Sequence, residues 1–465
     1  MNKVNTLLAS FVVSLASFIG ASSQSVAASV SAASCSYAAV SSAIATALVG
    51  DTVSVPGGSC SWDTTLTLNK GISLIGAGVS NTVITSNASD FLISYEPSDP
   101  SKNTLMRISG FTFDLGAGNR SGIYISSGNT LILQTKIRVD HNRFQNIAQG
   151  STQNNFIWFG GVRGVIDNNY FTAAYQAIRN PTDPTNTSGK LYWENFEGIV
   201  FGKVDNNMYF EDNVFNVVGN GPGLQDTQEG SRWAFRYNTI YAPNGGQPLF
   251  DHHGNWGQQY SGMGGELYGN NIIGGGGRFL DQRGGRFISF NNNFTTSGWT
   301  YQLREEADDG DTPVGTYLGP NSPQYPQHVN GTYVWGNRVN YTGSSIGYSL
   351  GPNCHGSVCY TTDIPRPGRD FFTEATSPGI NCGTPDSRPL ACMAGQGYWA
   401  TYQSCSNVAG MVGDHPATPI AGTLYKCTGT NTWNSGNSPL PYPHPLRGAA
   451  NGLLPPHMNP PVVLP

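Results

Sequence analysis

Asn142-Arg143-Phe144 begins a series of seven segments in which an asparagine is followed by any residue and then by an apolar one. The later members are Asn169-Tyr170-Phe171, Asn213-Val214-Phe215, Asn238-Thr239-Ile240, Asn270-Asn271-Ile272, Asn292-Asn293-Phe294 and Asn337-Arg338-Val339. Successive asparagines are 27, 44, 25, 32, 22 and 45 residues apart, so one unit spans about 22 to 27 residues and is sometimes enlarged or doubled. A repeat in this range indicates a solenoid.

Each unit contains short alternating or apolar segments, such as Val165-Ile166-Asp167 and Trp233-Ala234-Phe235, with Gly and Asn between them. These segments read as β-strands and leave no room for a long helix. Asparagine tolerates the left-handed backbone conformation that a tight corner requires. Because stacked coils lie about 4.8 Å apart, identical Asn side chains can form a hydrogen-bonded ladder. The sequence therefore predicts a β-solenoid with asparagines at one corner.

The N-terminal part of the chain is expected to close the solenoid. Residues 37–47 have apolar side chains at helical spacing, which predicts a short helix over the open end of the first coil. The segments Gly50-Asp51-Thr52-Val53-Ser54-Val55-Pro56-Gly57-Gly58 and Gly71-Ile72-Ser73-Leu74-Ile75-Gly76-Ala77-Gly78 follow. Together these features resemble the opening of the pectin-lyase-like superfamily, over about residues 35–345.

This resemblance implies an all-β fold, a right-handed parallel β-helix with an N-terminal capping helix. The superfamily includes lyases, glycoside hydrolases, esterases and noncatalytic adhesins, so the fold does not name the chemistry. It also implies that a substrate lies along one of the parallel sheets.

The chain begins with Lys3, an apolar stretch over residues 7–21 and small residues at 25–28, which is typical of a signal peptide. The apolar run, about 15 residues, is shorter than the roughly 20 needed to span a bilayer. We therefore expect a secreted or periplasmic protein with a signal peptide over residues 1–27 and a parallel β-helix over residues 28–350. The Cys-, Pro- and Gly-rich segment 351–465 is expected to pack on the helix as a disulfide-pinned tail.

Eight cysteines, an even number, favour disulfides in an exported chain over metal-bound or catalytic thiols. They are Cys35, Cys60, Cys354, Cys359, Cys382, Cys392, Cys405 and Cys427. The spacing does not fix their connectivity. We expect neighbours along the chain to pair, with Cys35 bonded to Cys60 at the start and three bridges in the tail.

The composition narrows the choice of partner. Only 11% of the residues are charged, 24 basic against 29 acidic, which does not fit the basic surface of a nucleic-acid-binding protein. Beyond residue 28, no stretch is apolar for long enough to cross a membrane. The 59 glycines, with many Asn, Tyr and Trp, suit a turn-rich β surface on which aromatic rings stack on sugars. We expect a monomer whose partner is a polysaccharide.

Five segments can be aligned on a large apolar residue and are expected to stack as strands of one sheet. They are Phe159-Gly160-Gly161-Val162, Phe201-Gly202-Lys203-Val204, Leu224-Gln225-Asp226-Thr227, Phe250-Asp251-His252-His253 and Leu280-Asp281-Gln282-Arg283. If the aligned residue faces the core, the second and fourth residues face outward, because side chains alternate along a strand. The outward positions then change from small residues to the polar group Gln225, Asp251, His253, Asp281 and Arg283.

Because the resemblance implies that the substrate lies along such a sheet, we predict a catalytic site at Asp251, His253, Asp281 and Arg283. The substrate-binding candidates are Gln225, Asp226, Lys203 and the loop aromatics Trp256 and Tyr260, although alternation points Lys203 and Asp226 inward. Another long loop supplies Trp299, Tyr301 and the acidic run over residues 305–309. Two aspartates on adjacent coils lie about 5 Å apart, and like charges at that distance disfavour double ionisation. A shared proton, Arg283, or a calcium ion bound by Asp251 and Asp281 would compensate.

Three functions remain open. A polysaccharide lyase cleaving a uronate-containing chain by β-elimination would use His253 as base and Arg283 or calcium to neutralise the sugar carboxylate. A glycoside hydrolase would use paired carboxyl groups such as Asp251 and Asp281. A noncatalytic carbohydrate-binding protein would use the same polar strip without an acid or base. The sequence favours the lyase.

Overall fold

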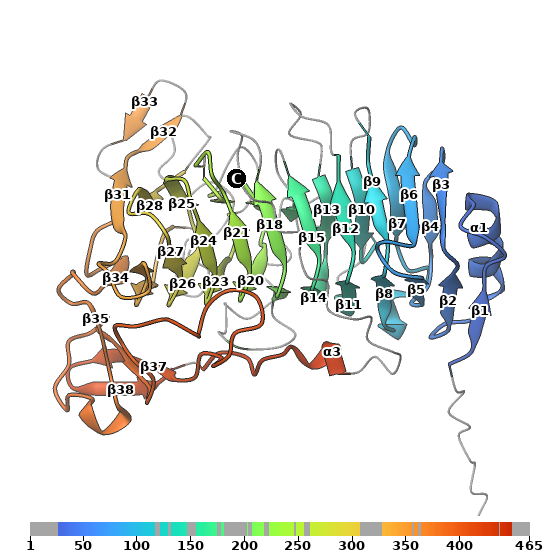
Figure 1. Ribbon diagram of the computed structural model, residues 1–465. Coiled ribbons are helices and arrows are strands. Elements are labelled where there is room, and N and C mark those ends of the chain that lie inside the picture. The colour runs from blue at the N-terminus through green and yellow to red at the C-terminus, as the bar shows by residue number, and fades with distance from the viewer. Residues whose placement is uncertain are drawn as a thin grey trace, which may run out of the picture.

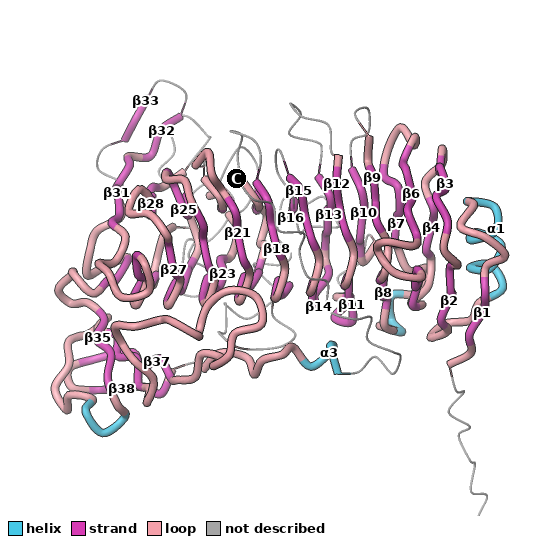
Figure 2. Tube along the Cα trace, viewed as in Figure 1, coloured by secondary structure: helices cyan, strands magenta, loops and turns pink. Residues whose placement is uncertain are grey.

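A computed structural model describes residues 27–116, 121–128, 132–146, 155–173, 178–180, 202, 207–217, 223–245, 248–254, 261–306, 328–355, 358–360, 364–436 and 438–448. Within these ranges the chain winds in coils that stack along one axis, and the strands of successive coils form three parallel sheets, as Figures 1 and 2 show. This confirms the expected parallel β-helix. The expected signal peptide lies outside the described residues, except for residue 27.

Sheet 1 is the longest of the three. Its twelve described strands, in spatial order, are β1 (Ser29–Ser31), β2 (Thr52–Val55), β5 (Ser73–Gly76), β8 (Met106–Ser109), β11 (Gln134–Asp140), β14 (Val162–Asp167), β17 (Met208–Glu211), β20 (Arg232–Arg236), β23 (Gly264–Tyr268), β26 (Arg286–Phe290), β29 (Thr332–Trp335) and β34 (Phe371–Thr373). Because β34 pairs in parallel with β29, the sheet continues past residue 350, where we had expected the helix to end.

Sheet 3 follows sheet 1 in each coil and carries the apolar residue of the asparagine motif. Its described strands are β3 (Gly58–Trp62), β6 (Thr82–Ser86), β9 (Thr112–Asp114), β12 (Arg143–Gln145), β15 (Tyr170–Ala173), β18 (Val214–Val217), β21 (Thr239–Tyr241), β24 (Asn271–Ile273), β27 (Asn293–Phe294) and β30 (Arg338–Val339). Phe144, Phe171 and Phe215 stack at centroid separations of 4.8 Å. The repeated aromatic therefore forms a continuous stack in the core.

Sheet 2 completes each coil. Its described strands are β4 (Leu66–Leu68), β7 (Phe91–Tyr95), β10 (Ser121–Ser126), β13 (Asn155–Gly160), β16 (Ile178–Asn180), β19 (Gln225–Thr227), β22 (Phe250–His252), β25 (Gly277–Gln282), β28 (Trp299–Arg304) and β31 (Gly347–Gly351). β16 lies between β13 and β19, the place we had predicted for residues 201–204. Trp299 and Tyr301, expected beside the substrate, instead face the core, because burial alternates along β28.

The asparagine ladder runs along the corner between sheets 1 and 3, as predicted. The backbone N–H of each ladder asparagine from Asn142 to Asn292 donates to the side-chain oxygen of the next, at 3.0 to 3.1 Å. The left-handed conformation belongs to the residue before the asparagine, for example His141 at φ 52° and Tyr237 at φ 54°. The prediction that the asparagine itself adopts it was therefore wrong; the side chain of the asparagine bridges coils instead.

The first coil is closed by α1 (Tyr37–Thr46), which confirms the expected cap (Figure 1). The Ser36 hydroxyl accepts a hydrogen bond from the Ala39 N–H, which satisfies one of the free donors at the start of the helix. Val40 and Ile44 are buried against the coil. The predicted Cys35–Cys60 disulfide joins this region to β3.

The C-terminal part holds a hairpin and a small sheet. The hairpin of β32 (Asn353–His355) and β33 (Val358–Tyr360) places Cys354 opposite Cys359. The sheet consists of β35 (Ile380–Gly383), β36 (Gly397–Ala400), β37 (Thr423–Gly429) and β38 (Thr432–Ser435), beside the short helix η2 (Pro385–Ser387). Its disulfides are Cys382–Cys405 and Cys392–Cys427. Pairing of neighbours is therefore wrong here, because β37 folds back antiparallel on β36 and brings Cys427 to Cys392.

The last described residues, 438–448, which we call the strap, run along the outer face of sheet 1 and end in α3 (Pro445–Gly448) (Figure 1). The Arg236 guanidinium donates to the Leu440 carbonyl, and the Tyr442 hydroxyl donates to Asp212 at 2.6 Å. The His444 N–H donates to Glu211 at 2.7 Å. These contacts hold the strap on the sheet.

Another short helix, η1 (Pro100–Lys102), lies between β7 and β8. Among the described residues, no helix is both long enough and apolar enough to cross a membrane.

Candidate functional site

The outer face of sheet 2 carries three aspartates in one column. Asp226 on β19, Asp251 on β22 and Asp281 on β25 are consecutive register partners. Gln225 pairs instead with Phe250 and is 1% exposed, so it lies in the core and not on the outer face. Asp226 and Gln225 have thus exchanged the faces that we predicted, because a slip of one residue turns a strand over.

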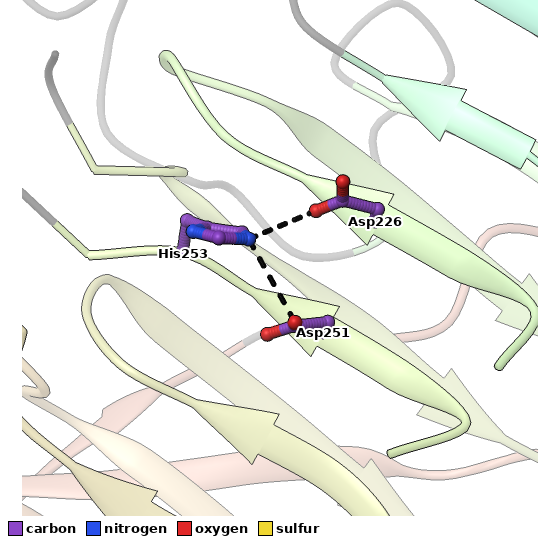
Figure 3. Close-up of side chains that lie close together, drawn as sticks. All are labelled: Asp226, Asp251 and His253. Atoms are coloured by element: carbon purple, nitrogen blue, oxygen red, sulfur yellow. Dashed lines mark ion pairs between the residues drawn. The ribbon is translucent and has the colours of Figure 1, made fainter. Parts of the chain in front are cut away.

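Asp226, Asp251 and His253 converge at the C-terminal ends of β19 and β22, as Figure 3 shows. His253 Nε2 lies 3.0 Å from Asp226 Oδ1 and 3.7 Å from Asp251 Oδ2. The side chains of the three residues are 12 to 18% exposed. The histidine therefore bridges the two carboxyl groups on a face that solvent still reaches.

Arg283 and Glu306 complete this group. The Arg283 guanidinium contacts both Asp251 and Glu306, and its Nη2 lies 2.8 Å from His253 Nε2. Glu306 Oε2 lies 3.4 Å from His253 Nδ1 and accepts the Gly254 N–H at 2.9 Å. We call Asp226, Asp251, His253, Arg283 and Glu306 the sheet 2 cluster. The sequence pointed to Glu306 only as part of an acidic run.

The cluster sets distinct charge states. Burial and Arg283 lower the pKa of His253, but Asp251, Glu306 and Asp226 outweigh them and raise it to about 10. Burial raises the pKa of Asp251, against the opposing effect of Arg283 and His253. Burial also acts to raise the pKa of Glu306, but Arg283 and His253 prevail and hold it well below its usual value. At neutral pH the cluster therefore contains a cationic histidine, an ionised Glu306 and, in Asp251, a carboxyl group whose proton is held more tightly than usual.

Asp281 belongs to a different ion-pair group. Arg304 contacts both of its oxygens, at 3.0 and 2.8 Å, and Arg278 contacts Oδ2 at 3.0 Å. The carboxylate is 1% exposed, whereas the two arginines are 30 and 32% exposed. Asp281 thus occupies the predicted register position beside Asp251, but its oxygens are engaged by arginines.

Residues inside the coil support the cluster. His252 points into the core, where its Nδ1 lies 2.8 Å from the Thr227 hydroxyl. Burial lowers the pKa of His252 to about 3, so the ring stays neutral. A Cβ on Gly262 would lie 2.2 Å from His252 Cε1, so only glycine leaves room for the ring. Two adjacent histidines therefore have opposite properties, because alternation places them on opposite faces.

The expected calcium site does not fit this arrangement. Asp226, Asp251 and His253 offer ligand atoms within 4.8 Å of one another. Calcium takes six to eight oxygen ligands, and this set supplies a nitrogen and two carboxylates. Arg283 already contacts Asp251, and arginines engage both oxygens of Asp281. The pair Asp251 and Asp281 is thus poorly suited to hold calcium.

The remaining predicted residues, Lys203, Trp256 and Tyr260, lie outside the described residues. Arg179 on β16 holds the register position next to Asp226, on the side away from Asp251. Of the predicted site, the structure thus brings together Asp226, Asp251, His253 and Arg283.

Comparison with known proteins adds little to this geometry. No family model and no curated protein matches the chain. Among solved structures, the ORF18 protein of Geobacillus virus E2 aligns with a TM-score of 0.34 and 12% identity, over 86% of this chain and 72% of that one. The function must therefore be argued from the chemistry of the site.

Proposed function

We propose that this protein hydrolyses the glycosidic bonds of a long polysaccharide lying along the outer face of sheet 2. The observation that carries the proposal is the placement of Asp226 and Asp251 at one register position on adjacent coils, both facing outward with His253 between them. Glycoside hydrolysis requires two carboxyl groups, one protonated and one ionised. Burial raises the pKa of Asp251, which favours its protonated form, and the contact with His253 favours the ionised form of Asp226.

Asp251 is the acid in this scheme, because burial raises its pKa. It donates its proton to the glycosidic oxygen as the bond to the anomeric carbon breaks, and Arg283 stabilises the carboxylate that forms. Asp226, kept ionised by the protonated His253, attacks the anomeric carbon. Water then gives a proton to Asp251 and its hydroxyl to the anomeric carbon, while the ester bond between that carbon and Asp226 breaks, which frees the sugar and restores the Asp226 carboxylate.

The separation of the two carboxyl groups favours retention of configuration. One oxygen from each lies within 4.8 Å of the other. Retaining enzymes have carboxyl groups about 5 to 5.5 Å apart, whereas inverting enzymes need about 6.5 to 9.5 Å to admit a water molecule. We therefore propose a retaining mechanism.

β-Elimination finds less support in this geometry. The lyase scheme uses His253 as base, but a pKa of about 10 leaves the histidine protonated at neutral pH. It also requires a free cation for the sugar carboxylate, whereas Arg283 is engaged by Asp251 and Glu306. Hydrolysis uses the charge states as they stand.

We also propose that the chain is exported and is a member of the pectin-lyase-like superfamily. Three described disulfides support export, because such bonds persist in oxidising compartments. The stacked parallel sheets and the N-terminal segments that resemble the superfamily support the second proposal.

The test is a screen of the purified protein on polygalacturonate, alginate, xylan and β-glucan, read for new reducing ends and for ultraviolet absorbance of unsaturated sugars. We expect reducing ends without absorbance. Asp226→Asn and Asp251→Asn should each lower turnover by about 10³-fold or more, because each removes one of the two reacting groups. Asp114→Asn is the matched control, since Asp114 lies on sheet 3, where its carboxylate accepts hydrogen bonds from Gly116, Gln145 and Asn146.

Rising absorbance in step with the reducing ends would replace hydrolysis by β-elimination. Binding without either product would indicate a noncatalytic carbohydrate-binding protein. Full turnover by both Asp226→Asn and Asp251→Asn would reject the carboxyl pair.

A further inference from the structure

The column that holds Asp226 and Asp251 continues along sheet 2 toward the first coils of the helix. Asp226 pairs with Arg179, Arg179 with Trp158, and Trp158 with Tyr124. Within β10 and β13, Tyr124 and Trp158 are partly exposed, whereas the flanking Ile123, Ile125, Ile157 and Phe159 are buried. The two aromatic side chains thus face the same side of the sheet as the two carboxyl groups.

Phe91 joins these residues in one aromatic surface. Its ring centroid lies 4.9 Å from that of Tyr124 and 5.8 Å from that of Trp158. The Tyr124 and Trp158 rings are 6.4 Å apart and nearly perpendicular, at 82°. All three residues remain partly exposed, although the rings pack against one another. The column then ends in small hydroxyl residues, Ser94 and Thr67.

The spacing of this surface matches a sugar chain. Neighbouring strands lie about 4.8 Å apart, close to the length of one pyranose unit in an extended chain. Trp158 lies two register positions from Asp226 and Tyr124 lies three, which corresponds to roughly 10 and 14 Å. A polysaccharide cleaved at Asp226 and Asp251 that follows the helix axis would reach the aromatic surface within two to three sugar units.

We propose that Trp158 and Tyr124 form a stacking subsite for a pyranose ring of the same polysaccharide chain. The C–H face of a pyranose is apolar, and a large aromatic ring offers it contact area at a small cost in conformational entropy. The subsite binds substrate without touching the reacting bond, so it sets the affinity for long chains. This proposal rests on the cleavage function proposed above.

Two substitutions at one position separate stacking from packing. Trp158→Leu keeps apolar bulk but removes the aromatic face, and Trp158→Phe keeps a smaller aromatic face. Trp433→Leu is the matched control, because Trp433 lies on β38, outside sheet 2. The midpoint of thermal unfolding, compared with that of the wild type, shows whether each Trp158 variant keeps its packing against Phe91 and Tyr124.

Binding is measured without turnover, by affinity electrophoresis of Asp226→Asn in gels containing polygalacturonate, alginate, xylan or β-glucan. We expect at least one polymer to retard this protein, and Trp158→Leu to weaken that retardation about tenfold. Trp158→Phe should have a smaller effect, and Trp433→Leu none. In the otherwise wild-type enzyme, Trp158→Leu should raise KM for the polymer while kcat stays within about twofold. Oligosaccharides too short to reach Trp158 should show no change in KM.

The outcomes distinguish the subsite from the cleavage function. If Trp158→Leu binds and cleaves polymer like its parent while Asp226→Asn loses turnover, the subsite is rejected and the cleavage function stands. If Trp158→Leu weakens binding but the wild type cleaves none of the polymers, the subsite stands and the cleavage function fails. A loss in kcat alone, or failure of all four polymers to retard Asp226→Asn, would also overturn the subsite.

Discussion

Two clusters of charged side chains lie on different faces of the same β-helix. On sheet 1, Arg236 pairs with Glu211 beneath the strap, and both side chains are 0% exposed. On sheet 2, Arg283 pairs with Asp251, and these side chains are 8 and 18% exposed. Both clusters join an arginine to a carboxylate on a neighbouring coil, so residue type alone does not separate them.

The difference lies in what else the arginine binds. Arg236 also donates a hydrogen bond to the Leu440 carbonyl of the strap. Nearby, Arg447 of the strap pairs with Asp167 and Asp212 of the helix. That cluster attaches a chain segment to the helix. Arg283 instead orients a carboxyl group and a histidine that no described strap residue covers. The sheet 1 cluster therefore holds the strap on the helix, whereas the sheet 2 cluster is partly exposed and is the site of the proposed hydrolysis.

The largest expected effect on stability is at Arg236. Arg236→Met should lower the free energy of unfolding by about 3 to 5 kcal/mol, because the buried Glu211 would lose its shortest ion pair and keep only Arg447 and the His444 N–H. Denaturant unfolding measures the change. Arg143→Gln is the control, since Arg143 is half-buried on sheet 3, where it stacks on Tyr170, and should matter little. A loss below about 1 kcal/mol in Arg236→Met would contradict the structural role of the sheet 1 cluster.

The stability of the protein should also depend on His253 in the sheet 2 cluster and on His444 in the strap, at opposite extremes of pH. The pKa of His253 is raised to about 10, so its stabilising effect is complete below pH 6.5 and is lost as the pH rises through 10. Burial lowers the pKa of His444 in the strap to about 3, so its contribution is complete above pH 6.5 and is lost as the pH falls toward 3. Each loss should amount to roughly 2 kcal/mol.

The free energy of unfolding, measured from pH 4 to pH 10.5, tests the predictions for His253 and His444. His253→Gln should flatten the alkaline side of the stability profile, and His444→Gln should flatten the acid side. If either substitution flattens the opposite side, the assignment of charge states in that cluster is wrong.

The smallest effect on stability and turnover is expected at Asp281, the register neighbour of Asp251. Asp281→Asn removes a carboxylate that pairs with Arg278 and Arg304, both of which are partly exposed. We expect a stability loss of about 1 kcal/mol and turnover within about threefold of the wild type. Steady-state kinetics on the cleaved polymer measures it. A loss as large as that of Asp251→Asn would restore Asp281 to the catalytic pair.

The sequence predicted the coil architecture because the asparagine ladder repeats the same contact at every corner. It also grouped Asp251, His253 and Arg283, which the structure brings together. It misplaced Asp226, because Leu249 and Phe250 are both large and apolar, and Leu224 can be aligned with either. The structure sets Leu224 opposite Leu249, through a hydrogen bond of 2.7 Å between the Leu224 N–H and the Leu249 carbonyl.

Other details depend on contacts that no local pattern carries. Glu306 reaches His253 and Arg283 from a strand end one coil beyond Arg283, so only the folded helix brings them together. The tail disulfides follow from the antiparallel return of β37 on β36, which spacing of cysteines does not reveal. Periodic features were therefore predictable, and contacts that occur once were not.

The most direct test of the contrast between the clusters measures unfolding and turnover on the same two variants, Asp226→Asn and Arg236→Met. We predict that Asp226→Asn unfolds nearly like the wild type, since the amide keeps the size of a partly exposed side chain, but loses about 10³-fold in turnover. Arg236→Met should be strongly destabilised yet turn over normally per folded molecule. If Asp226→Asn retains full turnover, or if Arg236→Met loses turnover while its stability is unchanged, the assignment of chemistry to sheet 2 is contradicted.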